Sequence, residues 1–206
     1  ILRMWFIISM VMKTIEEIEK YAKEKYVPIA RKDLVSYLIK LTKENGYKKV
    51  LECGSGIGYT SIQLALIEGV HVNTFEYFQP RYEVCVENIK DFGLEDKICL
   101  SDKNILDATL DSDYDLIFID GAKKHTVEIF NFLKNKIKDN GTIIVDNIDL
   151  EVVNKIEVES KKIKYQQIAK ETKEYFENIT EYNAIYMPLG DGIFKVTKKW
   201  FIGGDT

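Results

Sequence analysis

The chain has 206 residues, 46% of them hydrophobic, and 29 Lys plus Arg against 33 Asp plus Glu give a net charge of −4. A chain of this length and apolar content can bury a core without disulfides or metal staples, which excludes a disordered chain and a small cross-linked scaffold. The mild acidity argues against a protein held on nucleic acid by a broad basic face, although local contact with RNA stays open. We expect a single domain over residues 1–206.

The first twelve residues are mostly apolar. This stretch is too short for a membrane span, which takes about 20 residues, and Lys13, Glu16 and Glu17 follow it where a signal peptide would have a cleavage site. We expect a helix that packs on the domain or on a partner subunit, or else an artefact of the start site with Met12 as the natural start. Three cysteines without a paired spacing favour the reducing cytoplasm, and no membrane association is expected.

Residues 1–45 are expected to form a helical extension, in which apolar residues recur at helical spacing over 32–44 before Asn45-Gly46 ends the run. The α/β core, residues 46–206, then alternates short apolar strands with helices. The expected strands are 49–53, 71–75, 97–100, 116–120 and 142–146, and the expected helices are 59–67, 80–92 and 127–137.

The last part of the chain has a different pattern. Residues 150–181 are polar, with six Lys against seven Glu, and predict a mostly helical segment with a solvated face. Residues 184–188 and 193–197, on either side of the L-G-D-G turn, predict an antiparallel hairpin. The fold class is therefore α/β: a doubly wound, mostly parallel sheet covered on both faces, with N-terminal helices and an antiparallel C-terminal hairpin.

A glycine-rich turn, L-E-C-G-S-G-I-G-Y-T at 51–60, follows the first strand. A dinucleotide fingerprint would need glycine at position 59, which is Tyr59, and Glu52 would repel a pyrophosphate. An acid before the turn suits a cationic ligand such as S-adenosylmethionine. Glu76, which closes the next strand, can accept hydrogen bonds from both hydroxyls of a ribose. The alternative is a turn that only packs helix on sheet.

A second group of polar residues ends two later strands. Asp120 closes one strand with Lys123 three residues on, and Asp146 and Asn147 close the next. If these strands are neighbours, the three oxygen donors meet at the carboxyl edge of the sheet and suit Mg²⁺. A metal-bound hydroxyl is more acidic, so Lys123 could take its proton. His125 is the alternative base, and simple capping by the acids is the alternative to a metal site.

These residues resemble the class I, S-adenosylmethionine-dependent, metal-dependent O-methyltransferases of the catechol and caffeoyl-CoA type, especially their bacterial relatives. The resemblance covers residues 27–198 and rests on four signatures: the turn at 51–60, the acid Glu76, D-G-A-K at 120–123 and D-N at 146–147. It implies a Rossmann-like methyltransferase fold, usually in a homodimer.

The resemblance also assigns roles to residues. The glycine turn and Glu52 would hold the methionine part of the cofactor, Glu76 the ribose, and the pair after the third strand would lie near the adenine. The implied cofactor-binding residues are Glu52, Gly54, Ser55, Gly56, Tyr59, Thr60, Glu76, Ser101, Asp102 and Asp120. Asp120, Asp146 and Asn147 would hold Mg²⁺, and Lys123 would be the catalytic base.

Departures from the family concern the acceptor. Ile185 stands near the place where catechol methyltransferases carry a substrate-binding Glu, which makes free catechol a poorer candidate. The L-G-D-G turn at 189–192 is similar to the bacterial branch that includes tRNA wobble 5-hydroxyuridine methyltransferases. That branch's arginine-containing stretch after D-N is not evident, and Lys161, Lys162 and Lys164 supply local positive charge instead.

The sequence thus predicts a Mg²⁺-dependent O-methyltransferase that acts on a hydroxyl of a small phenolic substrate with a neighbouring oxygen. One alternative is a tRNA wobble 5-hydroxyuridine O-methyltransferase. The others are a non-catalytic cofactor-binding module and a nucleotide-dependent oxidoreductase.

Overall fold

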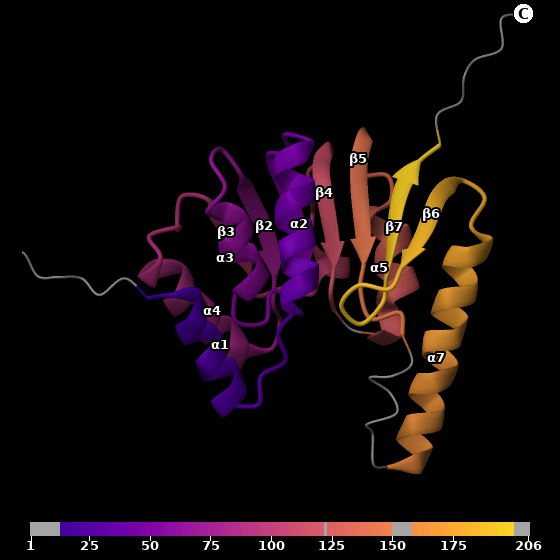
Figure 1. Cartoon of the computed structure of the whole chain (residues 1–206), viewed down its shortest axis with the longest axis horizontal. Coiled ribbons are helices and arrows are strands. Elements are labelled where there is room, and N and C mark those ends of the chain that lie inside the picture. The colour runs from indigo at the N-terminus through magenta and orange to yellow at the C-terminus, as the bar shows by residue number, and fades with distance from the viewer. Residues whose placement is uncertain (1–12, 122, 150–157, 200–206) are drawn as a thin grey trace, which may run out of the picture.

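The computed structural model describes residues 13–121, 123–149 and 158–199. A seven-stranded sheet with strand order β3-β2-β1-β4-β5-β7-β6 forms its centre, and helices lie along the sheet (Figure 1). The strands are β1 (Lys49–Cys53), β2 (His71–Phe75), β3 (Ile98–Ser101), β4 (Tyr114–Ile119), β5 (Ile137–Val145), β6 (Tyr182–Met187) and β7 (Ile193–Lys198). The helices are α1 (Ile15–Glu24), α2 (Lys32–Glu44), α3 (Tyr59–Ala65), α4 (Gln79–Asp91), α5 (Thr126–Leu133) and α7 (Glu159–Asn178), with short 3₁₀ turns η1 (Ile105–Asp107) and η2 (Lys123–His125).

The direction of the strands confirms the expected fold class. The first five strands run parallel, and β7 pairs antiparallel with both β5 and β6, so the predicted C-terminal hairpin closes the sheet. The order reverses at β1, which lies between β2 and β4. Ligands of such sheets bind beyond the carboxyl ends of the strands at this switch point, which is where the glycine turn lies.

Apolar side chains on alternate residues of the strands build two cores, one on each face of the sheet. On β4, Leu116 and Phe118 belong to the core under α2 and α3, whereas Ile117 and Ile119 belong to the core under α5 and α7. All four side chains are at most 1% exposed. The apolar run at 116–119 therefore has a partner layer on both faces of the sheet, as its sequence indicated. None of the helices within the described ranges is long and apolar enough to cross a bilayer.

Two predicted boundaries were wrong. The helix expected over 127–137 ends at Leu133, because the chain turns there through a hydrogen bond from Lys136 N to Leu133 O of 2.7 Å. The strand expected at 142–146 begins earlier, at Ile137, which pairs with Tyr114 before a shift in register. Ile137 is 3% exposed, so its burial in the sheet outweighs the helical spacing of the preceding apolar residues.

The remaining elements match their predicted ranges to within a few residues, and α7 accounts for the described part of the polar segment at 150–181. The helix expected in the first twelve residues lies outside the described residues.

Candidate active site

A cavity of about 350 Å³ lies at the carboxyl edge of the sheet. It collects side chains and backbone from the glycine turn, from the ends of β2, β4 and β5, and from the turn between β6 and β7. Ten residues predicted from the sequence line it: Gly54, Ser55, Gly56, Tyr59, Thr60, Glu76, Asp120, Lys123, Asp146 and Asn147. The structure thus joins the predicted cofactor loop and the predicted metal edge in one cavity.

Three predicted residues do not line this cavity. Glu52 is 1% exposed and lies inside the sheet, beneath the glycine turn. Ser101 lines a separate cavity at the β3 edge, although its carbonyl accepts a hydrogen bond of 3.0 Å from Glu76 N. Asp102 is exposed. A direct contact of these three residues with a cofactor stays a prediction.

The Glu76 carboxylate is fixed by backbone donors on both of its oxygens. Gly56 N donates to Oε2 at 3.0 Å and Phe78 N donates to Oε1 at 2.9 Å, and the residue is 6% exposed. Gly56 has φ +54°, and a Cβ there would meet only Pro28 O at 3.8 Å, so the turn leaves open space above Glu76. A rigid acceptor beside open space is suited to hold a ligand with neighbouring hydroxyls.

The glycine turn is supported from α4. Asn88, 1% exposed, donates to Ile57 O at 2.7 Å, and Cys85 Sγ lies 3.7 Å from Ser55 Oγ. A Cβ on Gly58 would lie 3.1 Å from Cys85 Sγ. Gly58 does not line the cavity, and this close packing, together with its φ of +87°, explains why the third glycine of the turn is needed.

Gly54 is required by a contact between the two functional loops. Its φ is +98°, and a Cβ there would lie 2.3 Å from Asp120 O. Gly54→Ala should therefore lower the free energy of unfolding by about 2 to 4 kcal/mol, because strain in the left-handed region adds to a clash with backbone. Urea unfolding measures this loss.

Gly46→Ala is the matched control, since Gly46 has φ +64° but nothing within 4 Å of an added Cβ. It should lose about 1 kcal/mol through backbone strain alone. Equal losses for the two variants would contradict the close approach of the glycine turn to Asp120.

Burial raises the pKa of Glu52 to about 7. A hydrogen bond of 2.6 Å from Thr74 Oγ1 to Glu52 Oε2 acts in the opposite direction and lowers this pKa. The folded protein then holds this proton more tightly than the unfolded chain, where the pKa is near 4.5. Stability from this group is therefore full below about pH 4.5 and falls as the pH rises toward 7.

Glu52→Gln should remove this pH dependence. Between pH 5 and pH 8 the free energy of unfolding of the wild type should fall by about 1 to 3 kcal/mol more than that of the variant. Urea unfolding of both proteins at the two pH values tests this. An equal change in the free energy of unfolding for the two proteins would show that Glu52 ionises alike in the folded and unfolded states.

Two carboxylates and an amide meet at the ends of β4 and β5. Asn147 Nδ2 donates to Asp120 Oδ1 at 2.9 Å, and Asn147 N donates to Asp146 Oδ1 at 2.7 Å. Asn147 adopts φ +66°, a conformation that a non-glycine residue rarely takes and that turns its amide toward Asp120. The predicted approach of these three side chains is present.

Burial and neighbouring charges raise the pKa of both acids. Burial, and then the neighbouring charge of Asp146, raises the pKa of Asp120 well above its usual value. Burial raises the pKa of Asp146 to about 7, with a further contribution from Asp191. Lys123, on η2, opposes both shifts. Two ionised carboxylates this close repel one another unless a cation lies between them. Acids with shifted pKa values that line a cavity are typical of functional sites.

His125, the alternative base, lies on the surface. Its Nδ1 is 2.8 Å from Glu128 Oε2, both side chains are more than half exposed, and neither residue lines the cavity. Lys123 does line the cavity, and its role as the base stays a prediction.

Comparison with known proteins identifies the family. Residues 7–199 match the family model described as O-methyltransferase. The chain belongs to the O-methyltransferase family. The family resemblance and the class of enzyme predicted from the four signatures are thereby confirmed, and the oxidoreductase alternative is set aside.

The individual relatives are named as methyltransferases, two of them as O-methyltransferases. A protein from Staphylococcus aureus described as a caffeoyl-CoA O-methyltransferase has a TM-score of 0.82 and 25% identity, over 91% of this chain and 93% of that one. An O-methyltransferase from Bacillus cereus, solved in complex with SAH, has a TM-score of 0.74 and 22% identity, over 91% and 93%. A Sulfurisphaera tokodaii protein named as a cobalt-precorrin-6B C(15)-methyltransferase (decarboxylating) is 26% identical over 141 residues, 66% of this chain and 72% of that protein.

Sequence reasoning missed part of the wall of this O-methyltransferase cavity. The loop between α1 and α2 contributes residues 28–31, and the turn between β6 and β7 contributes Asp191. Tyr77 lines the cavity from the loop before α4, and Arg81 from the first turn of α4. Only Asp191 stood in a segment singled out by the sequence, the L-G-D-G turn. The loop at 28–31 carries no glycine or acid pattern, so nothing in the sequence placed it over the cavity.

Proposed function

We propose that this chain is a Mg²⁺-dependent, S-adenosylmethionine-dependent O-methyltransferase whose acceptor is a small phenolic compound with two neighbouring oxygens. The observation that carries the proposal is that Asp120, Asp146, Asn147 and Lys123 line the same cavity as the glycine turn and Glu76. A cofactor at the glycine turn and an acceptor at the oxygen donors would therefore share one space, as direct group transfer requires.

The residues fit the cofactor. Glu76 offers a carboxylate with fixed orientation for the ribose hydroxyls, and the open space at Gly56 admits the ligand close to the backbone. Carboxylates around the cavity favour a ligand with positive groups. The SAH complex of the Bacillus cereus relative, which shares this fold, supports the same cofactor class.

The residues also fit a hard divalent cation. The donors at the edge are oxygens of Asp120, Asp146 and Asn147, the ligand type that Mg²⁺ prefers, and the two carboxylates repel one another without a cation. When bound, such a cation lowers the pKa of an acceptor hydroxyl. Lys123 would take the hydroxyl proton at Nζ, and the apolar residues Pro28 and Ile29 would exclude water from an aromatic acceptor.

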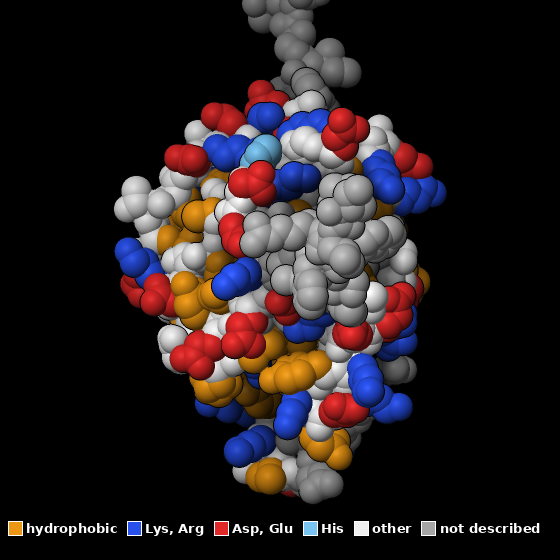
Figure 2. Space-filling model, turned by 90° about the vertical axis from the view of Figure 1, so that its left-hand side faces the viewer, with side chains coloured by type: hydrophobic (Ala, Val, Ile, Leu, Met, Phe, Trp, Pro, Cys, Tyr) orange, Lys and Arg blue, Asp and Glu red, His pale blue; other side chains and the backbone are white. Residues whose placement is uncertain are grey.

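The tRNA alternative predicts a surface that follows a phosphate backbone. Acidic and basic side chains are interspersed on the one face shown in Figure 2, so this face offers no continuous basic surface. We keep the small acceptor first. Assembly as a homodimer and a cytoplasmic location stay predictions of the sequence.

Labelled S-adenosylmethionine, offered with Mg²⁺ and either small-molecule or tRNA fractions of an extract, tests the proposal. The label should pass to the small-molecule fraction, and EDTA should stop the transfer. Transfer that survives EDTA would contradict the metal role. Label in tRNA alone would replace the acceptor by the tRNA alternative.

A further inference from the structure

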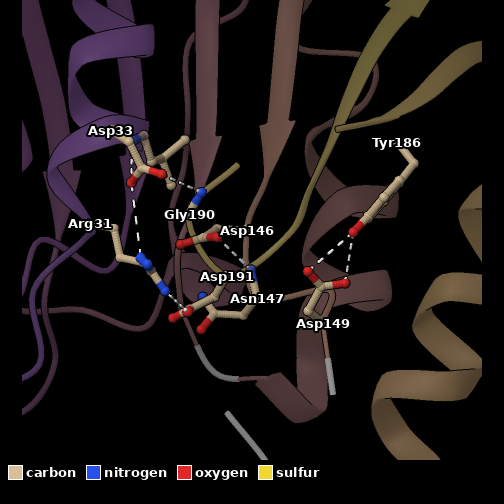
Figure 3. A network of polar contacts seen from close by, with 9 residues as sticks. Arg31, Asp33, Asp146, Asn147, Asp149, Tyr186, Gly190 and Asp191 are labelled. Carbon is tan, nitrogen blue, oxygen red and sulfur yellow. Dashed lines mark hydrogen bonds and ion pairs between the residues drawn. The ribbon is translucent and has the colours of Figure 1, made fainter. Parts of the chain in front are cut away.

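Part of the cavity wall is made by two segments 160 residues apart in sequence. Arg31, just before α2, donates from Nη1 to Asp191 Oδ1 at 3.3 Å. Gly190 N donates to Asp33 Oδ2 at 3.3 Å, and Arg31 Nε lies 3.9 Å from Asp33 Oδ1. Figure 3 shows the Arg31 side chain between these two acids, with Asp146 and Asn147 alongside. The guanidinium therefore belongs to the part of the cavity where the acceptor would bind.

The Asp191 side of this contact is rigid. Asp149 N donates to Asp191 O at 2.9 Å and Ile148 N donates to Gly192 O at 3.0 Å. The Tyr186 hydroxyl donates a hydrogen bond shared between the two Asp149 carboxylate oxygens, at 2.9 and 3.1 Å. A Cβ on Gly192 would lie only 2.5 Å from Asp149 Cγ. The turn thus presents Asp191 from a fixed backbone, and Asp191 in turn orients Arg31.

Most of the hydrogen-bonding capacity of Arg31 is unused. A guanidinium has five N–H donors. Among the described residues only Asp191 accepts a hydrogen bond from it, since 3.9 Å to Asp33 is an ion pair but too long for a hydrogen bond. The Arg31 side chain is 60% exposed, so its pairing with Asp191 adds little to stability. The remaining N–H donors of Arg31, which have no acceptor among the described residues, are therefore available to a ligand in the cavity.

The arginines of this chain are concentrated at this cavity. The sequence has Arg only at positions 3, 31 and 81, among 29 Lys plus Arg, and both described arginines line the cavity. Arg31 lies beside Asp146, at the end of the cavity proposed for the acceptor. Arg81 lies in the first turn of α4, five residues after Glu76, and its guanidinium carbon is 5.4 Å from the Phe78 ring centre. Arginine differs from lysine chiefly in its planar fork, which pairs with both oxygens of a carboxylate.

We propose that Arg31 selects acceptors that carry a carboxylate in addition to the reacting hydroxyl, an inference that rests on the proposed function of the same cavity. A carboxylate left free there would be repelled by Asp146 and Asp191, so pairing with the oriented guanidinium decides whether such an acceptor binds. Arg31 is in this role a specificity residue, and the apolar wall of Pro28 and Ile29 would contact the ring.

Calorimetric titration of the protein, loaded with S-adenosylhomocysteine and Mg²⁺, with catechol and with 3,4-dihydroxybenzoate tests the proposal. The wild type should bind the carboxylated probe about tenfold more tightly or better. Arg31→Gln should reduce this preference to about twofold or less, and Arg31→Lys should give an intermediate value because it keeps the charge and loses the fork. The preference is a ratio within one protein, so a general loss of stability does not mimic the effect.

Lys40→Gln is the matched control, because Lys40 lies on α2 away from the cavity, its side chain is 69% exposed, and it is within 3.8 Å of Glu44. It should keep the wild-type preference. A wild type without preference, a preference that survives Arg31→Gln, or no binding of either probe would overturn the proposal. Methyl transfer measured with the same protein preparations, with S-adenosylmethionine in place of S-adenosylhomocysteine, separates the two claims, since a preference without transfer contradicts the proposed function alone.

Discussion

Asp146→Asn should lower kcat/KM for methyl transfer by about 10²- to 10³-fold while leaving the fold intact. Asp146 stands 6% exposed at the end of β5, and its Oδ1 accepts a hydrogen bond from Asn147 N that an amide oxygen can also accept. The substitution therefore removes the negative charge from the oxygen donors and little else. Initial rates at saturating S-adenosylmethionine, with and without added Mg²⁺, measure the effect.

The same substitution makes an opposite prediction for stability. Because burial raises the pKa of Asp146 to about 7, its charged form costs free energy in the folded protein at higher pH, without a bound cation. In EDTA at pH 8, Asp146→Asn should unfold at the same temperature as the wild type or at a higher one. A variant that is both inactive and less stable would indicate a structural acid.

Asp139→Asn is the control for loss of a carboxylate from the same strand. Its side chain is 82% exposed and pairs with Lys198 at 2.9 Å, at the other end of β5 from the cavity. It should keep wild-type rates and the wild-type response to Mg²⁺. Full activity of Asp146→Asn after EDTA treatment would remove the metal from the proposed function.

The candidate site was predictable from the sequence where local pattern and strand ends coincide. The apolar run before Glu52 and the run before Asp120 each predict a buried parallel strand, and parallel strands end at one edge. This reasoning brought Asp120, Asp146 and Asn147 together, and the 2.9 Å contact between Asn147 and Asp120 bears it out.

What the sequence left open depends on contacts between distant segments. Nothing in the pattern around Arg31 shows that it meets Asp191, 160 residues later, because that contact arises from the way α2 packs on the turn of the hairpin. A Cβ on Gly190 would lie 3.2 Å from Leu34, so the turn reaches α2 only with glycine there. Specificity residues of this kind are fixed by tertiary packing, which a local pattern does not encode.

The burial of Glu52 is a second feature that the local sequence pattern does not show. The contact of Glu52 with the cofactor stays a prediction, but its burial was not foreseen from its place before the glycine turn. Alternation along β1 turns its side chain into the core, where Thr74 Oγ1 donates to it at 2.6 Å. Glu52 pairs within the ladder, whereas Asp120 follows it.

Lys123→Met should lower kcat by about 10²- to 10⁴-fold, the contribution of a positioned base. Lys123→Arg should lower it nearly as much, because a guanidinium keeps the positive charge near Asp120 and Asp146 but does not accept a proton at neutral pH. If Lys123 acted only through its charge, the arginine variant would retain the wild-type rate. Single-turnover rates of methyl transfer separate these outcomes.

A second readout distinguishes proton transfer from positioning. The deficit of Lys123→Met should shrink with a nitro-substituted catechol, whose hydroxyl ionises more readily and needs less help from a base. Lys124→Met is the control, since Lys124 is exposed, lies outside the cavity and stands 6.0 Å from the Tyr165 ring centre. A deficit of equal size with both acceptors would mean that Lys123 positions the acceptor, because a positioning residue is indifferent to the acidity of the group it holds.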